Sequence, residues 1–328
     1  MNLKDKINSF PKTPGIYMMK DKYGDVIYVG KSKKLKERVK SYFVNSKNHS
    51  RKVKRMVKNI YDIEIILTDT ELDALLLECE LIKEIRPMYN QLMKNHENYS
   101  YIKVDKNIEY PYLEVAKEID DESIYLGPYT MDKKLDEIIN IISREYKIRT
   151  CKIMNKCIKY DLNKCIGPCR DTMNKEEYNK LIDEIINDLN NSSENLITIL
   201  NEKMQDEISN LNFEKAKDIN HEIGLLKSLS HKQDIINNAN ENKLILAWIN
   251  LNNENIKIYL IKGAKLLKSE IINIEDFELN NLIYKIKEKI IRNEENTDEE
   301  LVDKYYIDFA NIVYSYIKSN KDINYKYI

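Results

Sequence analysis

Apolar and polar positions alternate along the chain in a pattern that predicts short strands mixed with amphipathic helices. Two strand-like runs, 15–20 and 26–29, flank a turn that contains Gly24, which is typical of a β-hairpin. Another alternating run, 62–67, predicts a third strand. Helical periodicity predicts the other N-terminal elements, which are helices over 33–43, 51–59 and 71–85.

The helix over 71–85 has clear end signals and one unusual polar residue. Thr70 can cap its first turn, and Asp73 three residues later completes a capping-box pattern. Pro87 stops the helix because proline cannot continue it. Glu78 shares a stripe with Leu and Ile residues, where a carboxylate is costly unless it meets a cation or a metal. A snorkelling Glu or a partner for a nearby lysine is the structural alternative.

The remaining sequence predicts strands and helices in separate blocks. Strand-like runs and one helix come first, at 99–104, 112–116, 123–126 and 132–145. Residues 175–232 are almost free of Gly and Pro, and breaks near 191–193 and 210–212 separate their predicted helices. An antiparallel meander and two helices follow, at 244–251, 256–261, 265–272, 279–292 and 298–318.

Charge is distributed unevenly along the chain. Residues 1–60 contain 17 Lys/Arg and 4 Asp/Glu, whereas the remainder contains 36 and 50, so the net charge of −1 hides a basic N-terminal module. This asymmetry indicates a polyanion partner, or else a solvated lysine-rich surface. The longest apolar run, 244–249, is far shorter than the ~20 residues of a membrane helix. With no apolar signal core at the N-terminus, we expect a cytoplasmic protein without a membrane partner.

Several N-terminal polar residues are candidates for chemistry. Arg38 and Tyr42 lie four apart on one predicted helix and share a face, where the guanidinium fork could bind a phosphate. Tyr17 and Tyr28 lie on opposite limbs of the predicted hairpin. A surface arginine and a structural aromatic pair are the alternatives that the residues alone leave open.

The motifs around these residues resemble a known nuclease family. Gly15-Ile16-Tyr17 and Tyr28-Val29-Gly30 resemble the paired motifs of the GIY-YIG superfamily. Residues 28–43, 71–83 and 86–90 resemble the UvrC excision-repair nuclease family more closely, with Val29 for the more usual Ile as the only departure. The resemblance implies hydrolysis of a DNA phosphodiester with one Mg²⁺ or Mn²⁺, for which Glu78 is the only protein ligand.

The resemblance also implies roles for further residues near Glu78. Tyr28 corresponds to the general base for the attacking water, and Lys31, Arg38 or the metal would make its proton easier to remove. Arg38 would stabilise the charge that grows on the phosphoryl oxygens. The residues implied to position water, phosphate or metal-bound groups are Tyr17, Tyr42 and Asn90.

Four of the five cysteines form a group with the spacing C-x5-C-x7-C-x3-C, namely Cys151, Cys157, Cys165 and Cys169. Disulfides are not expected in a cytosolic chain, so a zinc site or an iron–sulfur cluster is the sharper interpretation. Resemblance to the cysteine region of UvrC implies a [4Fe–4S] cluster, with zinc less expected, although the first spacing is shorter than in the family. Stray cysteines in a connector are the alternative. We expect Cys79, next to Glu78, to be a core residue.

The predicted helical hairpin over 200–229 has an apolar stripe on its second helix. An ordinary buried stripe is the first interpretation of such a pattern. The hairpin also resembles the UVR motif through which UvrC and UvrB pair, which implies an exposed apolar face that docks on UvrB. The predicted UvrB-binding residues are Phe213, Ala216, Ile219 and Ile223.

Together these features predict an α+β protein, and 328 residues suffice for two or three domains. We expect a GIY-YIG nuclease domain over 1–97, connecting strands, a helix and the four cysteines over 98–174, and a helical region over 175–234. The segment 235–328 would be a small α+β unit that resembles the middle of UvrC.

The resemblance covers nearly the whole chain but about the N-terminal half of a full-length UvrC, without its RNase H-like nuclease or its helix-hairpin-helix motifs. It implies a short form that makes only the 3′ incision near a lesion in double-stranded DNA, together with UvrB. The alternatives are a free-standing GIY-YIG nuclease with another DNA target and a non-cleaving regulator that binds UvrB.

Overall fold

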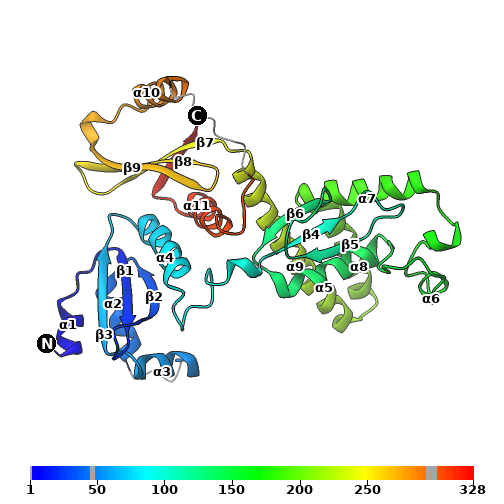
Figure 1. Cartoon of the computed structure of the whole chain (residues 1–328), viewed down its shortest axis with the longest axis horizontal. Helices are drawn as coiled ribbons and strands as arrows, with labels where there is room; N and C mark the ends of the chain where they lie inside the picture. Colours follow the sequence, from blue (N-terminus) through cyan, green and yellow to red (C-terminus); the bar gives the residue numbers. More distant parts are fainter. Residues whose placement is uncertain (1, 45–48, 293–300) are drawn as a thin grey trace. The chain divides into compact units, whose positions relative to one another are not determined.

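The computed structural model describes residues 2–44, 49–292 and 301–328 (Figure 1). The chain has the predicted α+β class and forms two compact units. The first unit combines Met1–Glu97 with Ala239–Ile328, and the second contains Asn98–Asn238. Within the described ranges, no helix combines the length and the apolar character that a membrane span requires.

In the first unit, residues 1–97 form a three-stranded antiparallel sheet of order β2-β1-β3. The strands match the predicted hairpin and third strand, and they are β1 (Gly15–Lys20), β2 (Val26–Ser32) and β3 (Asp62–Leu67). The α-helices described beside this sheet are α1 (Leu3–Ser9), α2 (Leu35–Phe43), α3 (Arg51–Lys58) and α4 (Glu71–Ile85). The periodicity did not predict α1, whose Asn2 side chain accepts a hydrogen bond from the N–H of Lys4.

Helix α4 begins and ends at the residues predicted from its sequence. The Thr70 side chain accepts a hydrogen bond from the N–H of Asp73, while the Asp73 carboxylate accepts one from the N–H of Thr70. Both halves of the capping box are therefore present. The buried face of α4 contains Leu72, Ala74, Cys79, Ile82 and Lys83. Burial also raises the pKa of Cys79 to about 12, which agrees with its expected place in the core.

The remainder of the first unit contains a four-stranded antiparallel sheet of order β10-β7-β8-β9. Its strands are β7 (Leu244–Asn250), β8 (Asn255–Lys262), β9 (Lys265–Asn273) and β10 (Ile323–Tyr327), and its helices are α10 (Leu279–Arg292) and α11 (Ile307–Ser319). The predicted start of the last helix at 298 is wrong for residues 301–306, because the Asp303 side chain accepts the N–H of Tyr306 and forms a turn instead. Residues 298–300 lie outside the described ranges.

The second segment of the first unit packs against α4. The Lys83 ammonium lies 2.6 Å from the Asp308 carboxylate of α11, and both side chains are buried. At the other end of α4, the hydroxyls of Thr70 and Tyr259 are 2.5 Å apart, and Lys257 pairs with Asp69 at 2.7 Å. Residues distant in sequence therefore fix both ends of this helix.

The second unit contains a three-stranded antiparallel sheet of order β5-β4-β6 together with helices. Its strands are β4 (Ser100–Val104), β5 (Leu113–Ala116) and β6 (Ile124–Tyr129). Its helices are α5 (Asp132–Glu145), α6 (Ile158–Asp161), α7 (Lys175–Asn190), α8 (Glu194–Ser209) and α9 (Phe213–Asn240), of which α9 continues into the first unit. Both predicted breaks in the helical region are present, between α7 and α8 and between α8 and α9.

Candidate active site

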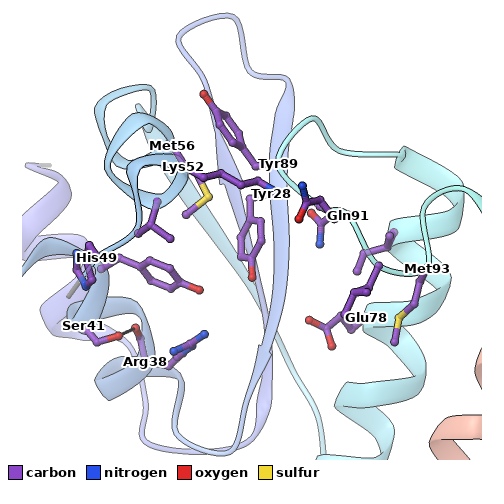
Figure 2. Close-up of a pocket in the computed structure, with 15 residues that line it drawn as sticks. Tyr28, Arg38, Ser41, His49, Lys52, Met56, Glu78, Tyr89, Gln91 and Met93 are labelled. Carbon is purple, nitrogen blue, oxygen red and sulfur yellow. Dashed lines mark hydrogen bonds between the residues drawn. The ribbon is translucent and has the colours of Figure 1, made fainter. Parts of the chain in front are cut away.

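A cleft of about 450 Å³ opens on the N-terminal part of the first unit (Figure 2). Five of the predicted catalytic residues line it, and they are Tyr28, Arg38, Tyr42, Glu78 and Asn90. They come from β2, α2, α4 and the segment that follows α4. In Figure 2, the Glu78 carboxylate faces the opposite wall, which carries Tyr28 and Arg38. Residues more than sixty positions apart in the sequence therefore line one cleft.

Tyr28 and Tyr42 line the wall of the cleft opposite Glu78, and Tyr17, which does not line the cleft, packs against both of them. Tyr17 is buried, and its hydroxyl lies 2.9 Å from that of Tyr42. The ring centroid of Tyr28 is 6.1 Å from that of Tyr17 and 6.2 Å from that of Tyr42, which is within the range of favourable aromatic pairs. The motif glycine Gly30 makes this arrangement fit, because a Cβ there would lie 2.3 Å from the Tyr17 hydroxyl.

Tyr28 resists ionisation in this setting. Burial raises its pKa well above the ordinary value of 10, and the neighbouring Tyr42 and Glu78 raise it further. The expectation that Lys31 or Arg38 makes this proton easier to remove is therefore not met by the protein groups alone. Arg38 does lie beside the tyrosines, with its guanidinium carbon 5.0 Å from the centre of the Tyr42 ring.

Lys31 is placed differently from the prediction. Its ammonium forms a 2.6 Å ion pair with Glu71, which also binds Lys33 at 2.8 Å, and its side chain does not line the cleft. Its backbone N–H instead donates a 3.0 Å hydrogen bond to Oε1 of Glu78. Lys31 therefore orients the carboxylate through its main chain. Glu71 was missed in the sequence because its partners lie about forty residues away.

Glu78 has the features of a carboxylate held ready for a cation. Burial raises its pKa, while the Lys31 amide, Lys31 and Arg38 lower it to a smaller extent. None of the hydrogen bonds or ion pairs among the described residues involves its Oε2. One carboxylate with an unbonded oxygen on an open cleft suits a hydrated divalent ion, which takes most of its ligands from water. The donor set therefore fits the implied magnesium or manganese.

Asn90 acts on the backbone of β2. Its Oδ1 accepts a hydrogen bond from the N–H of Val29 at 2.9 Å, and its Nδ2 donates one to the carbonyl of Val29 at 2.9 Å. This pair of bonds fixes the strand position next to Tyr28. Asn90 therefore has a structural role, and its part in positioning water, phosphate or metal-bound groups stays a prediction.

The polar cleft residues that were not predicted include Ser41, His49, Lys52 and Gln91. Lys52 belongs to the basic helix α3, so the run of positive charge over 51–59 was a usable signal. His49 and Gln91 lie in connections between elements, where neither periodicity nor spacing indicates a direction for the side chain.

Comparisons with known proteins place these residues in a family. A model described as the UvrC-like GIY-YIG domain matches residues 13–91, and one described as the UvrC/Cho excinuclease middle domain matches residues 99–188. The chain belongs to the UvrC family. The UvrABC system protein C of Clostridioides difficile is 37% identical over 335 residues, which cover 98% of this chain and 55% of that protein.

Two further relatives extend the comparison. The UvrABC system protein C of Alkaliphilus oremlandii is 41% identical over 288 residues, covering 84% of this chain and 46% of that protein. The chain thus spans about half the length of these curated UvrC relatives. Among solved structures, the GIY-YIG N-terminal endonuclease domain of UvrC from Thermotoga maritima, bound to its catalytic divalent cation magnesium, is 38% identical. It covers 27% of this chain and 96% of the solved domain, with a TM-score of 0.25.

The four cysteines predicted as cluster ligands lie in the second unit, around α6. Burial raises the pKa of Cys165, and the thiols of Cys151, Cys157 and Cys169 are near enough to raise it further. In the described parts of the chain, no three or more His, Cys, Asp or Glu side chains are arranged to hold a metal ion. The four thiols are thus neighbours without forming a ready-made ligand set.

The predicted UvrB-binding stripe is only partly exposed. Ala216 and Ile223 are buried within the chain and Ile219 is half-buried, so the expectation of one continuous exposed face is wrong for the first two. Phe213 is 62% exposed and lies near the turn between α8 and α9, where Leu211 is also exposed.

Proposed function

We propose that this chain is a divalent-metal-dependent DNA endonuclease of nucleotide excision repair. The observation that carries the proposal is Glu78, whose free carboxylate oxygen faces Tyr28 and Arg38 across the cleft. A half-buried carboxylate opposite a phenol and a guanidinium is suited to hydrolysis of a phosphodiester that lies between them. A non-cleaving binding protein has no need of this arrangement.

In this proposal, the side chains on the two walls of the cleft have different roles in the reaction. Glu78 would hold Mg²⁺ or Mn²⁺, which when bound polarises the phosphate and stabilises the leaving oxygen. Arg38 binds the non-bridging phosphate oxygens and stabilises their growing charge. Once Tyr28 has lost its phenolic proton to solvent, its phenolate oxygen would accept a proton from the attacking water, while Tyr17 and Tyr42 fix the position of its ring.

Lys52 and His49 extend the basic wall beyond Arg38. In the proposed complex, Lys52 would contact a phosphate next to the scissile one, because its side chain lines the same cleft. The excess of Lys and Arg over residues 1–60 supports a duplex that lies along this face. We therefore expect binding to weaken steeply as the salt concentration rises.

The partner and the position of the cut are also part of the proposal. We infer that the chain acts with UvrB on double-stranded DNA that carries a lesion, and that its GIY-YIG centre makes the 3′ incision. The exposed apolar side chains at the α8–α9 turn, Leu211 and Phe213, support docking of a partner there. Substitution of Phe213 by Ser should weaken UvrB association, whereas exchange of the buried Ala216 tests only folding.

A nicking assay tests the central proposal. Lesion-bearing and intact duplexes would be incubated with Mg²⁺ or Mn²⁺, with and without UvrB. We expect a single 3′ nick that needs the lesion, UvrB and the metal, and a loss of more than about 100-fold in the Glu78→Gln variant. Nicking without UvrB or a lesion would favour a free-standing nuclease, and UvrB binding without any nick would favour a regulator.

Iron–sulfur ligation by Cys151, Cys157, Cys165 and Cys169 is a separate proposal. It is supported by the spacing of the four cysteines and by the effect of the other three thiols on the pKa of Cys165. Iron and acid-labile sulfide would be measured on protein purified without oxygen, with zinc measured on the same sample. Absence of all three elements from the purified chain would leave the cysteines as ordinary side chains.

A further inference from the structure

A second pocket of about 410 Å³ adjoins the cleft on the same part of the first unit. It lies where three connections meet, namely the β1–β2 turn, the α3–β3 connection and the segment after α4. We call it the side pocket, and its lining includes Lys22, Tyr23, Lys58, Tyr61, Met88 and Tyr89. Tyr89 lines both the cleft and the side pocket. Figure 2 shows Tyr89 beyond Tyr28, at the end of the cleft away from Glu78 and Arg38.

Large apolar side chains are exposed to solvent around the side pocket. Among the described residues of 1–97, four large apolar side chains are more than 70% exposed, namely Tyr23 (77%), Tyr61 (72%), Met88 (74%) and Leu92 (79%). The first three line the side pocket and the fourth lines the cleft. Exposed apolar side chains that gather in this way, rather than scatter singly, mark a binding surface.

The charges of the pocket restrict the class of ligand. Lys22 and Lys58 line it, and in the described part of the chain neither ammonium forms an ion pair with a carboxylate; that of Lys22 lies 4.7 Å from the centre of the Tyr23 ring, over one of its faces. Asp21 also lines the pocket, but its carboxylate accepts hydrogen bonds from the N–H groups of Tyr23 and Asp25 within the turn. The pocket therefore offers aromatic faces between two cations. An unpaired nucleotide, which has a flat apolar base and an anionic phosphate, matches both features.

Because the side pocket shares Tyr89 with the cleft, the DNA strand that occupies the cleft is the one that can reach the side pocket. A DNA strand that has its scissile phosphate between Glu78 and Arg38 passes Tyr28 and Lys52 and then reaches Tyr89. In a paired duplex the faces of the bases are stacked on each other, so exposed tyrosines gain little from them. We propose that the side pocket binds an unstacked base of the strand that occupies the cleft, with Tyr23 and Tyr61 as stacking surfaces.

This inference rests on the proposed function only in placing DNA in the cleft, and its test measures binding rather than cleavage. The full chain with Glu78→Gln would be titrated with three labelled probes of equal length: a single strand, a fully paired duplex and a duplex with a central unpaired bubble. The variant Tyr23→Ser/Tyr61→Ser would be compared with Tyr284→Ser, which removes a similarly exposed tyrosine from α10.

We expect the double variant to bind the single strand and the bubble at least about tenfold more weakly, since each base stacked on a ring contributes substantially. Binding to the paired duplex should change less than about twofold, as should all three affinities for Tyr284→Ser. Tyr23→Phe/Tyr61→Phe should bind like the parent, because it keeps the rings. Lys22→Gln/Lys58→Gln should weaken all three probes and flatten their salt dependence.

Two outcomes overturn the inference. An equal loss on all three probes would mean that the tyrosines contact only the backbone. No loss on any probe would mean that the exposed surface serves another ligand, such as a protein. If the parent nicks DNA but the tyrosines do not affect binding, only this inference fails. If the parent never nicks but bubble binding needs the tyrosines, only the nuclease proposal fails.

Discussion

At the scale of single residues, burial of Glu78 has a cost for folding that its proposed role as a metal ligand would offset. Its burial raises the pKa of the carboxyl, so the folded state holds this proton more tightly than the unfolded state does. Stability from this group therefore falls as the pH rises from its ordinary pKa, near 4.3, through the raised one. At neutral pH without a metal, the charged carboxylate destabilises the fold.

Glu78→Gln should relieve this cost. In EDTA at pH 7.5 we expect the variant to unfold at the same or a higher temperature than the parent, and its advantage should shrink at pH 5. Added Mg²⁺ or Mn²⁺ should raise the unfolding temperature of the parent but not of the variant. Differential scanning calorimetry would measure both effects, with Glu80→Gln on the exposed side of α4 as a control. A variant that unfolds earlier at pH 7.5 would indicate a structural carboxylate instead.

The protonation state of Tyr28 should determine how the rate of the proposed nicking reaction changes with pH. A general base acts only when deprotonated, and burial holds the pKa of Tyr28 well above 10. The single-turnover rate should therefore rise with pH, by about tenfold per unit at most, between roughly pH 6.5 and 9. Tyr28→Phe should abolish this rise. Tyr42→Phe should lower the rate but keep the slope, so a flat profile for the parent would remove Tyr28 from the role of base.

At the scale of elements, Asn90 joins the segment after α4 to β2. Asn90→Ala leaves the N–H and the carbonyl of the buried Val29 without their partner. We expect a loss of about 2 kcal/mol or more in the free energy of unfolding, because each buried group costs about 1–3 kcal/mol when its hydrogen bond is lost. Urea unfolding would measure it, and the exposed Asn8→Ala serves as control. Equal stability of the two variants would show that water replaces the amide.

Elements with local signals were predictable, and those that depend on distant residues were not. The bounds of α4 follow from Thr70, Asp73 and Pro87, which all lie within a few residues of its ends. Strand β10 was missed because its pairing partner is β7, more than seventy positions earlier. The residues of the site also differ in how far the sequence could predict them. Glu78 was identifiable as a carboxylate on an apolar stripe, whereas Glu71 depends on lysines from another element.

At the scale of the whole molecule, regions that are neighbours in the sequence do not always belong to the same compact unit. The segment after residue 239 joins 1–97 in one compact unit, although the second unit lies between them in sequence. A buried ion pair between Lys83 and Asp308 joins the two segments, with side-chain exposures of 1% and 7%. Lys83 also lies 5.0 Å from the centre of the Tyr305 ring. Lys83 lies about one and a half turns after Glu78 on α4, and helical periodicity alone could not predict that its partner is on α11.

Breaking this pair should destabilise the first unit strongly. Asp308→Asn leaves the Lys83 ammonium buried without a counter-charge, which costs about 3–5 kcal/mol in comparable cases. The double variant Lys83→Met/Asp308→Leu should recover most of this loss, because two apolar side chains need no partner. Urea unfolding would measure all variants. Glu270→Gln, which breaks the exposed pair with Lys268, should cost less than about 1 kcal/mol.

The comparison of the single and double variants separates charge burial from simple packing. If Asp308→Asn loses no more stability than Glu270→Gln, water reaches Lys83 and the two segments are not held together by a buried pair. If the double variant is as unstable as Asp308→Asn, the loss comes from shape rather than charge. The expected order of stability is therefore the parent and Glu270→Gln first, the double variant next, and Asp308→Asn last. Only that order of stability would show that the ion pair between α4 and α11 is needed because its charges are buried.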